Sequence, residues 1–443
     1  MKLLRNLYLN ERLFISLAII AGIFVMGFFF SSFITIAKLM VMILIAVVLT
    51  DLILIYRTRK GIRVHRFTPE RLSNGDDNNI RIYLENFYNF TINAEVIDEI
   101  PFQFQRRDLS FRFTLGAGKS HTIRYDLCPV KRGEYSFGST LVFVSTPLGM
   151  LCRRFLFGDA SIVPVYPSFL QMRHYELIAI SNRLVEHGIK KLRRIGHNME
   201  FELVREYIHG DDPRTINWKA TARQARPMVN QYQDERSQQV FCVIDKGRVM
   251  QMPFNGMSLL DYAINASLVV ANIAVKKYDK AGLITFQDDV GTFIPASGRN
   301  VQMRLFMEAL YHEKTGYRES DFSRLFGLIR QKITQRSLLL LFTNFESQFG
   351  LQRQLPFLTK LAQRHLLVVV FFENTELTGA INRRATKTRE VYYKAIAEKL
   401  SYDKKAMVRE LNALGIQAIY TAPENLTVNT INKYLELKAR GMI

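Results

Sequence analysis

The sequence predicts a multidomain chain: an N-terminal transmembrane helical hairpin, a small antiparallel β-sandwich, and then a doubly wound α/β domain. Three patterns predict this fold class. Residues 13–56 are mostly apolar, residues 57–167 alternate apolar and polar side chains, and residues 237–443 alternate continuous apolar runs with helical spacing. A chain of 443 residues also exceeds the size of one ordinary hydrophobic core, so several domains are expected.

Residues 13–56 are predicted to form two transmembrane helices. No formal charge occurs between residues 13 and 37, which is too long for the apolar core of a secretory signal peptide. As one helix, residues 13–56 would extend for about 65 Å, roughly twice the thickness of a bilayer core. We therefore expect two spans joined by a tight turn near residues 31–32.

Positive charges flank these two spans on the same side. Lys2, Arg5 and Arg12 precede the first span, and five cations follow the second between residues 57 and 66. The positive-inside rule therefore places the N-terminal tail (1–12), and everything after Arg57, in the cytoplasm. The net charge of +20 fits proximity to the anionic leaflet of a lipid bilayer, and three scattered cysteines suit a reducing compartment.

Residues 57–167 are predicted to form the β-sandwich. Four segments (80–87, 92–100, 109–115 and 121–127) alternate apolar and polar residues and are separated by glycine-rich turn signals. Short strands at this spacing are typical of an antiparallel sandwich. Residues 168–195 change to helical spacing and end in the basic run KKLRR, which predicts a helical basic linker.

Residues 237–443 are predicted to form the α/β domain. QQVFCVID, SLLLLFTN and HLLVVVFF are continuous apolar runs of the kind found in strands that are buried on both faces. Stretches with helical spacing lie between them. Strands alternating with helices predict βαβ units and a mainly parallel sheet.

Asp245 is the candidate metal ligand, because it ends the first of these strands, where ligands bind in open α/β sheets. A divalent-metal site of the Asp-x-Ser-x-Ser type would need serines at the positions of Gly247 and Val249, and a carboxylate where Asn344 stands. One carboxylate and one amide make a poor cage for a hard cation. We therefore expect a degenerate site with no metal and no cofactor. No P-loop, nucleophile elbow or His-Glu-x-x-His motif occurs, so no enzymatic activity is expected.

Residues 196–236 carry an unusual segment with the chain's single tryptophan, Trp218, among many charges. Pro213 suits the first turn of a helix over residues 215–223, which Asp211 or Asp212 can cap. We expect Trp218 to be a buried staple between the sandwich and the α/β domain. Arginines 205, 214 and 223 are expected to pair with nearby acids. The residues of this predicted domain junction are Glu200, Phe201, Arg205, Glu206, Tyr207, Gly210, Asp211, Asp212, Pro213, Arg214, Trp218, Lys219 and Arg223.

The stretch GHNMEFELVREYIHGDDPRTINWKATAR (196–223) resembles the signature of the bacterial "domain of unknown function 58" family. The likeness extends to KRGEYSFG, TPLGM and the membrane segment upstream, and to the C-terminus downstream. The resemblance implies a bacterial inner-membrane protein with a von Willebrand factor A-like domain and no established enzymatic activity. It also implies an association with a MoxR-type AAA+ ATPase, which is often encoded beside such proteins. The degenerate Asp245 motif departs from the full von Willebrand pattern.

Two functions from different classes follow. The first is a membrane-anchored adaptor or scaffold whose α/β domain binds protein partners, among them a MoxR-type AAA+ ATPase. The alternative is a metal-dependent hydrolase or nuclease that uses Asp245 with Asp211 and Asp212. Nucleic-acid binding is not favoured, because no groove with interleaved aromatic residues is evident. The sequence leaves the oligomeric state open.

Overall fold

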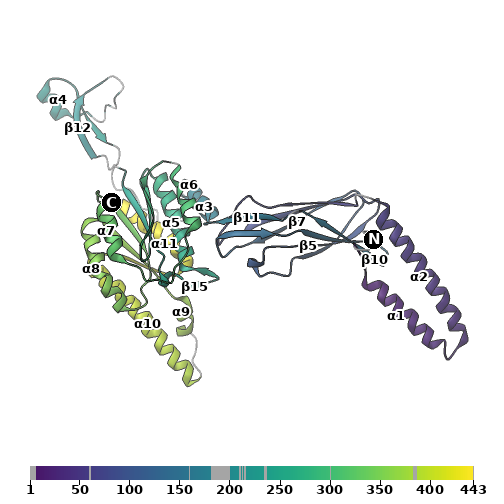
Figure 1. The fold of residues 1–443 in the computed structure, drawn as a ribbon. Helices are drawn as coiled ribbons and strands as arrows, with labels where there is room; N and C mark the ends of the chain where they lie inside the picture. Colours follow the sequence, from purple (N-terminus) through teal and green to yellow (C-terminus); the bar gives the residue numbers. More distant parts are fainter. Residues whose placement is uncertain are drawn as a thin grey trace. The chain divides into compact units, whose positions relative to one another are not determined.

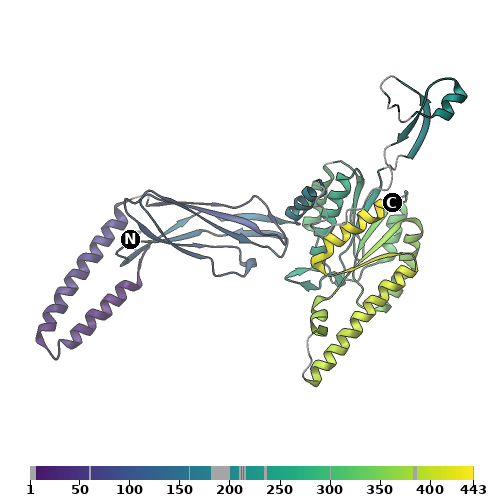
Figure 2. The same cartoon turned by 180° about the vertical axis from the view of Figure 1, so that it is seen from behind.

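The structure is a computed structural model that describes residues 6–58, 61–158, 160–180, 200–208, 211, 213, 216–233, 237–299, 301–382 and 387–442. The chain divides into two units, Met1–Tyr166 (unit 1) and Pro167–Ile443 (unit 2). Unit 1 holds the purple and blue elements of Figures 1 and 2, and unit 2 holds the teal to yellow ones.

Unit 1 contains the sandwich strands. They are β1 (Leu7–Leu9), β2 (Ile62–Phe67), β3 (Leu72–Ser73), β4 (Asn78–Asn86), β5 (Ile92–Asp98), β6 (Ser110–Leu115), β7 (Ser120–Leu127), β8 (Gly133–Phe137), β9 (Thr140–Ser145), β10 (Leu151–Phe157) and β11 (Ser161–Tyr166). The sheets have the orders β1-β10-β9-β5-β6, β2-β4-β7 and β3-β11-β8. Among the described strands of unit 1, only β3 and β11 pair in parallel.

Alternation along the strands builds the core of unit 1, because every second side chain of a strand points to the same face. In β4, Ile80, Ile82 and Leu84 are buried and join Val142 and Val144 of β9 in one hydrophobic cluster. The period-two pattern read from the sequence therefore corresponds to the inner face of these sheets.

Two helices follow β1 in unit 1, α1 (Glu11–Met26) and α2 (Ser31–Arg57), and they pack against each other. By length and composition, α2 could cross a membrane. The 16 residues of α1 span about 24 Å. One other described helix is long and apolar enough to cross a membrane, Leu259–Lys276, but it is buried in unit 2. The structure thus holds apolar N-terminal helices, and the transmembrane hairpin remains a prediction.

Polar contacts join these helices to the sandwich. The buried Asp51 carboxylate of α2 accepts hydrogen bonds from the backbone N–H groups of Met150 (2.9 Å) and Leu151 (2.8 Å) and from the Thr146 hydroxyl. Near the end of α2, the Ile55 carbonyl accepts a hydrogen bond from the Tyr88 hydroxyl at 3.0 Å. The sandwich therefore holds the last turns of α2 in a fixed position.

Unit 2 is built on a six-stranded sheet. Its strands are β14 (Gln239–Asp245), β17 (Lys280–Phe286), β18 (Val290–Ser297), β19 (Leu338–Phe342), β20 (Leu366–Phe372) and β21 (Gln417–Thr421). Their order is β18-β17-β14-β19-β20-β21, and all pairs are parallel except β17 with β18. Counted along the chain this is the order 3-2-1-4-5-6 of doubly wound folds, as predicted.

Helices cover both faces of this sheet (Figures 1 and 2). One hydrophobic cluster joins the sheet to α5, α6 and α11, and a second cluster joins the other face to α7, α8 and α10. The helices are α3 (Phe169–Ile180), α5 (Leu259–Lys276), α6 (Val301–His312), α7 (Phe322–Lys332), α8 (Gln348–Arg364), α9 (Thr375–Asn382), α10 (Thr388–Ala413) and α11 (Leu426–Ala439). Short elements are β15 (Pro253–Phe254), β16 (Met257–Ser258) and 3-10 turns at Phe102–Phe104, Arg248–Met250 and Pro423–Asn425.

The segment predicted as a basic linker begins with α3, which packs against α5. Glu176 of α3 forms an ion pair with Lys276 at 2.8 Å and accepts a hydrogen bond from Asn272 at 3.0 Å. Residues 181–199, with the KKLRR run, lie outside the described residues. The signature segment continues with β12 (Glu200–Glu206), α4 (Trp218–Gln224) and β13 (Met228–Gln233), and β12 pairs antiparallel with β13.

Candidate functional site

The first candidate site is the carboxyl edge of the sheet in unit 2. The strand order reverses between β14 and β19, and in doubly wound folds this switch point is where ligands bind. Asp245 is the last residue of β14, and Thr343 directly follows β19. The topology therefore places both side chains at the switch point.

Asp245 is almost completely buried, and both of its carboxylate oxygens accept hydrogen bonds. Gly247 donates its backbone N–H to Oδ1 at 2.8 Å, the Thr343 hydroxyl donates to Oδ2 at 2.6 Å, and the Ser320 hydroxyl donates to Oδ1. Burial raises the pKa of Asp245 above its ordinary value, and the three hydrogen bonds oppose that rise. The carboxyl group is thus a satisfied internal acceptor.

Ser320 occupies the space that a side chain at position 247 would need. A Cβ atom added to Gly247 would lie 2.1 Å from the Ser320 oxygen, so that serine would have to move. In the Asp-x-Ser-x-Ser pattern a serine at position 247 would supply a hydroxyl. Here the hydroxyl that contacts Asp245 comes from Ser320, in the loop before α7. Neither Ser320 nor Thr343 was singled out from the sequence, because Ser320 lies 75 residues from Asp245 and carries no spacing signal.

Asn344, the predicted remnant ligand on the later strand, is engaged by a cation of the protein itself. Its Oδ1 accepts a hydrogen bond at 2.6 Å from the Lys404 ammonium, which also donates to the Phe345 carbonyl. Burial lowers the pKa of Lys404 to about 8. These residues do not fit a divalent cation, because the carboxylate oxygens and the amide oxygen already accept hydrogen bonds. In the described part of the chain, no group of three or more His, Cys, Asp or Glu side chains could hold a metal ion.

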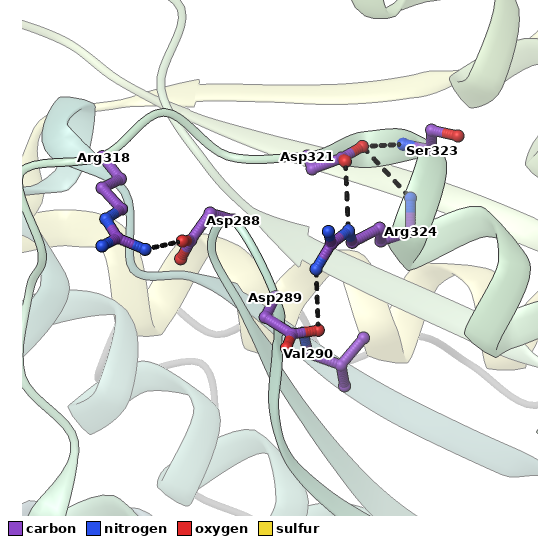
Figure 3. A network of polar contacts seen from close by, with 7 residues as sticks. All are labelled: Asp288, Asp289, Val290, Arg318, Asp321, Ser323 and Arg324. Carbon is purple, nitrogen blue, oxygen red and sulfur yellow. Dashed lines mark hydrogen bonds and ion pairs between the residues drawn. The ribbon is translucent and has the colours of Figure 1, made fainter.

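Exposed ion pairs surround this edge of the sheet. Figure 3 shows Arg318 with Asp288, and Arg324 between Asp289 and Asp321. Asp321 also caps α7, since it accepts hydrogen bonds from the backbone N–H groups of Ser323 and Arg324. Arg248 with Glu346 and Arg353 with Glu319 add two further pairs. Such pairs contribute little to stability individually, so the edge presents a surface of alternating charge.

The second candidate site is the hairpin of β12 and β13. Arg205 forms a bidentate pair with Asp211 at 2.7 and 2.8 Å, and Asp211 also accepts a hydrogen bond from the backbone N–H of Ile208. Bidentate geometry fixes both side chains, so this pair closes the turn that follows β12. The predicted pairing of Arg205 with a nearby acid is confirmed. Glu206 pairs instead with Arg226 at 2.8 Å, an arginine that the sequence analysis did not single out.

The helix within this hairpin begins later than predicted. α4 starts at Trp218, and its N-cap is Asn217, whose side-chain oxygen accepts a hydrogen bond from the backbone N–H of Ala220 at 3.0 Å. Asn caps a helix as well as Asp does. Ile216 forms a β-bridge with Val229, which holds the chain extended up to the cap. A helix from residue 215, with Pro213 in its first turn and an aspartate as its cap, was therefore wrong.

Trp218 is 72% exposed, so the prediction of a buried staple was wrong. An enclosed indole needs surroundings that cover roughly 150–250 Å² of its surface. α4 has only seven residues and packs on one strand of a two-stranded sheet, which is too small a structure to enclose it. Lys219 and Arg223 of the same helix are exposed as well.

The remaining predicted junction residues are placed as follows. Glu200 and Phe201 belong to β12, Tyr207 donates its backbone N–H to the Pro227 carbonyl at 2.9 Å, and Pro213 is exposed. Gly210, Asp212 and Arg214 lie outside the described residues. Among the described residues, the donors to Asp211 come from its own hairpin, whereas the donors to Asp245 come from the loops at the carboxyl edge of the sheet. The two carboxylates therefore share no hydrogen-bond donor in the ranges that the structure describes.

We expect Asp245→Asn to remove a pH-dependent loss of stability. Below about pH 4 the carboxyl is protonated in the folded and unfolded chain alike. As the pH rises, the unfolded chain ionises first because the folded pKa is raised, so the folded state loses stability up to that pKa. The amide keeps an oxygen for Gly247 and can donate to Thr343. Calorimetric melting of the full chain should show a variant-minus-wild-type difference that grows as the pH rises from about 4 towards the pKa of Asp245 in the folded chain.

The same two proteins test the metal alternative. Titration of the wild-type chain with Mg²⁺ and with Mn²⁺ should give no heat of binding. Binding in the wild type that disappears in Asp245→Asn would restore the hydrolase interpretation. A melting difference that is independent of pH would contradict the raised pKa.

Comparisons with known proteins agree with the resemblance. Residues 203–397 match the family model described as "Protein of unknown function DUF58", so the predicted resemblance is confirmed over this segment. The chain is 30% identical over 130 residues to "Uncharacterized protein YeaD" of Bacillus subtilis (strain 168), an alignment that covers 29% of this chain and 32% of the relative. The chain thus matches about a third of the length of that curated relative.

Two solved structures are similar at low identity. One is the conserved hypothetical protein BatB from Bacteroides thetaiotaomicron, at 14% identity and a TM-score of 0.30, covering 46% of this chain and all of that chain. The other is the VWA domain of SpRpn10, at 11% identity and a TM-score of 0.28, covering 44% of this chain and 93% of that one.

Proposed function

We propose that the protein is a membrane-anchored adaptor that faces the cytoplasm and binds a protein partner through the hairpin of β12, α4 and β13. The observation that carries this proposal is the exposure of Trp218. Tryptophan is the residue most enriched among the hot spots of protein interfaces, where it contributes far more binding energy than its neighbours. A hairpin that presents an exposed indole is suited to docking.

The charge around Trp218 indicates the kind of partner. Lys219 and Arg223 of the same helix are exposed, and the Arg205–Asp211 pair keeps the turn after β12 in place. An acidic patch with an apolar pocket would complement this surface. We propose a MoxR-type AAA+ ATPase as the partner, which the family resemblance implies. The test is capture of that ATPase by the full chain in lipid nanodiscs, and failure to capture it would contradict this choice.

The role we propose for the protein is binding and not catalysis. At the carboxyl edge, Asp245 is an internal acceptor and Asn344 is held by Lys404. The alternating charges around this edge (Figure 3) offer a second surface for protein contacts. Both surfaces belong to unit 2, which favours unit 2 as the docking part of the adaptor.

The pairing of β1 supports a hairpin anchor with both ends on one side of the membrane. β1 precedes α1, yet it pairs with β10, which follows α2 in the chain. If α2 crosses a membrane, the segment before α1 and the sandwich still share one side, because they share one sheet. The chain must then cross an even number of times, and α1 provides the second crossing. We propose that this shared side is the cytoplasm of a bacterium, at its inner membrane, because positive charges flank both helices.

We expect a reporter that is active only outside the cytoplasm to be silent when fused after Ile443. The physical reason is the even number of crossings together with the basic flanks. The same reporter inserted between Phe29 and Phe30, in the turn between α1 and α2, should be active and serves as the control. Activity of the C-terminal fusion would overturn the cytoplasmic placement, and a silent insertion would contradict the hairpin.

A further inference from the structure

The long helix α10 is buried along only part of its length. Its 26 residues run from Thr388 to Ala413, and Figure 1 shows its first half extending beyond the sheet. In the second half, Met407 and Leu411 are buried in the cluster that packs against the sheet. Before Met407, Ala397 is buried, but large apolar and aromatic side chains are exposed: Val391, Tyr392, Tyr393, Ile396, Leu400 and Tyr402.

Three of the exposed side chains continue the buried face of the helix. Residues 393, 396, 400, 404, 407 and 411 follow one another at intervals of three or four, so they share one face. Lys404, Met407 and Leu411 of this series contact the body of unit 2. Tyr393, Ile396 and Leu400 are 54%, 46% and 40% exposed. The first half of α10 therefore presents an apolar stripe that the body of unit 2 does not cover.

The stripe is bordered by positive charge on both sides. On the helical wheel, Lys394 lies on one side of the stripe and Lys399 on the other, while Glu390 and Asp403 lie close to its two ends. Within the described residues, neither lysine forms an ion pair. Residues 383–409 contain nine lysines and arginines but only three acids. This half of the helix combines exposed apolar area, tyrosines and unpaired cations.

We propose that the stripe of Tyr393, Ile396 and Leu400 lies on the surface of an anionic lipid bilayer. Helices with an apolar face edged by lysines bind the boundary between headgroups and acyl chains. Tyrosine favours that boundary, and lysine stems can follow the apolar surface while their ammonium groups reach the phosphates. A fluid headgroup layer neutralises cations on both sides of a narrow stripe, whereas a protein groove would have to place acids at fixed positions on each side.

This proposal rests on the proposed membrane anchor. A chain held at the membrane by α1 and α2 keeps α10 at a high effective concentration near the lipid, so a small stripe suffices for binding. The consequence is regulatory for the adaptor, because unit 2 would be held at the membrane only where anionic lipid is present.

The test uses the single tryptophan. In a Trp218→Phe background, Ile396→Trp makes emission report on the stripe alone. The full chain is reconstituted into nanodiscs of neutral lipid or of neutral lipid with anionic phosphatidylglycerol, each with and without brominated acyl chains. We expect blue-shifted emission and quenching by bromine only in the anionic discs. Lys394→Gln with Lys399→Gln should lower the bound-to-free ratio about 25-fold, since each cation near an anionic surface contributes about fivefold.

A matched control is Val391→Trp in the same background, because position 391 lies on the opposite side of α10 and should stay water-exposed in every disc. A blue shift at position 396 without bromine quenching would overturn the proposal in favour of a protein contact, such as a second copy. Red-shifted emission in anionic discs would overturn it as well. Resistance of the chain to carbonate extraction reports the anchor separately, so loss of the anchor and loss of α10 binding are distinguishable.

Discussion

Replacing Trp218 with alanine should weaken binding of the protein partner about 30-fold or more and leave thermal unfolding almost unchanged. Truncation of a hot-spot tryptophan typically costs at least about 2 kcal/mol of binding free energy. An exposed side chain contributes little to folding, so the free energy of unfolding should change by no more than about 0.5 kcal/mol. The indole is 72% exposed, which is why the two effects should separate.

The measurement is the affinity of the full chain in nanodiscs for the MoxR-type ATPase, combined with calorimetric melting. Phe102→Ala is the matched control, because Phe102 is an aromatic residue of unit 1 with 79% exposure. It should change neither quantity. A Trp218→Ala variant that melts many degrees earlier would show that the indole is enclosed after all. Unchanged affinity with unchanged melting would remove the hairpin from the docking surface.

Most of the architecture of unit 2 could be predicted from the sequence, because the spacing of apolar residues along a segment reflects which faces of that segment are buried. The runs 238–245, 337–344 and 365–372 contain β14, β19 and β20, and their continuous apolar character follows from burial on both faces. The Arg205–Asp211 pair was also predictable, since its members are six residues apart and the turn between them brings opposite charges together.

What could not be predicted depends on contacts between distant segments. Whether Trp218 is enclosed depends on how much structure surrounds it, and composition does not contain that information. The start of α4 was predicted too early because Asp211 and Asp212 are also good N-caps, whereas the β-bridge of Ile216 keeps the chain extended up to the actual cap, Asn217. Ser320 reaches Asp245 from the loop before α7, so no local motif identifies it.

Asp51 shows the same limit within unit 1. From the sequence it was an acid that interrupts the second apolar run. In the structure its carboxylate is fully buried and accepts hydrogen bonds from the turn around Thr146, Met150 and Leu151, about a hundred residues away. The TPLGM motif, noted only for its resemblance, is part of the turn that Asp51 binds. The acid is therefore one of the polar connections between the last turns of α2 and the sandwich.

Replacing Asp51 with alanine should destabilise this connection by at least about 3 kcal/mol. Three donors would lose their acceptor, two of them buried and the Met150 N–H partly buried, and each unsatisfied donor costs roughly 1–3 kcal/mol. In nanodiscs, the full chain should melt earlier, and trypsin should cleave faster at the basic residues between 57 and 66. Thr50→Ala is the matched control, because the neighbouring Thr50 hydroxyl donates only to the Val47 carbonyl of its own helix. It should change neither the melting nor the cleavage.

The variant Asp51→Asn distinguishes whether the position of the acceptor atoms or their negative charge stabilises the contact between α2 and the sandwich. The two backbone N–H groups both donate to Oδ2, and the Thr146 hydroxyl donates to Oδ1. An asparagine oxygen in the place of Oδ2 can accept both N–H groups, and its NH₂ group can donate to Thr146 once that hydroxyl rotates. If acceptor geometry is what matters, Asp51→Asn should retain most of the stability that Asp51→Ala loses. If Asn proves as damaging as Ala, the negative charge itself is required for the contact between α2 and the sandwich.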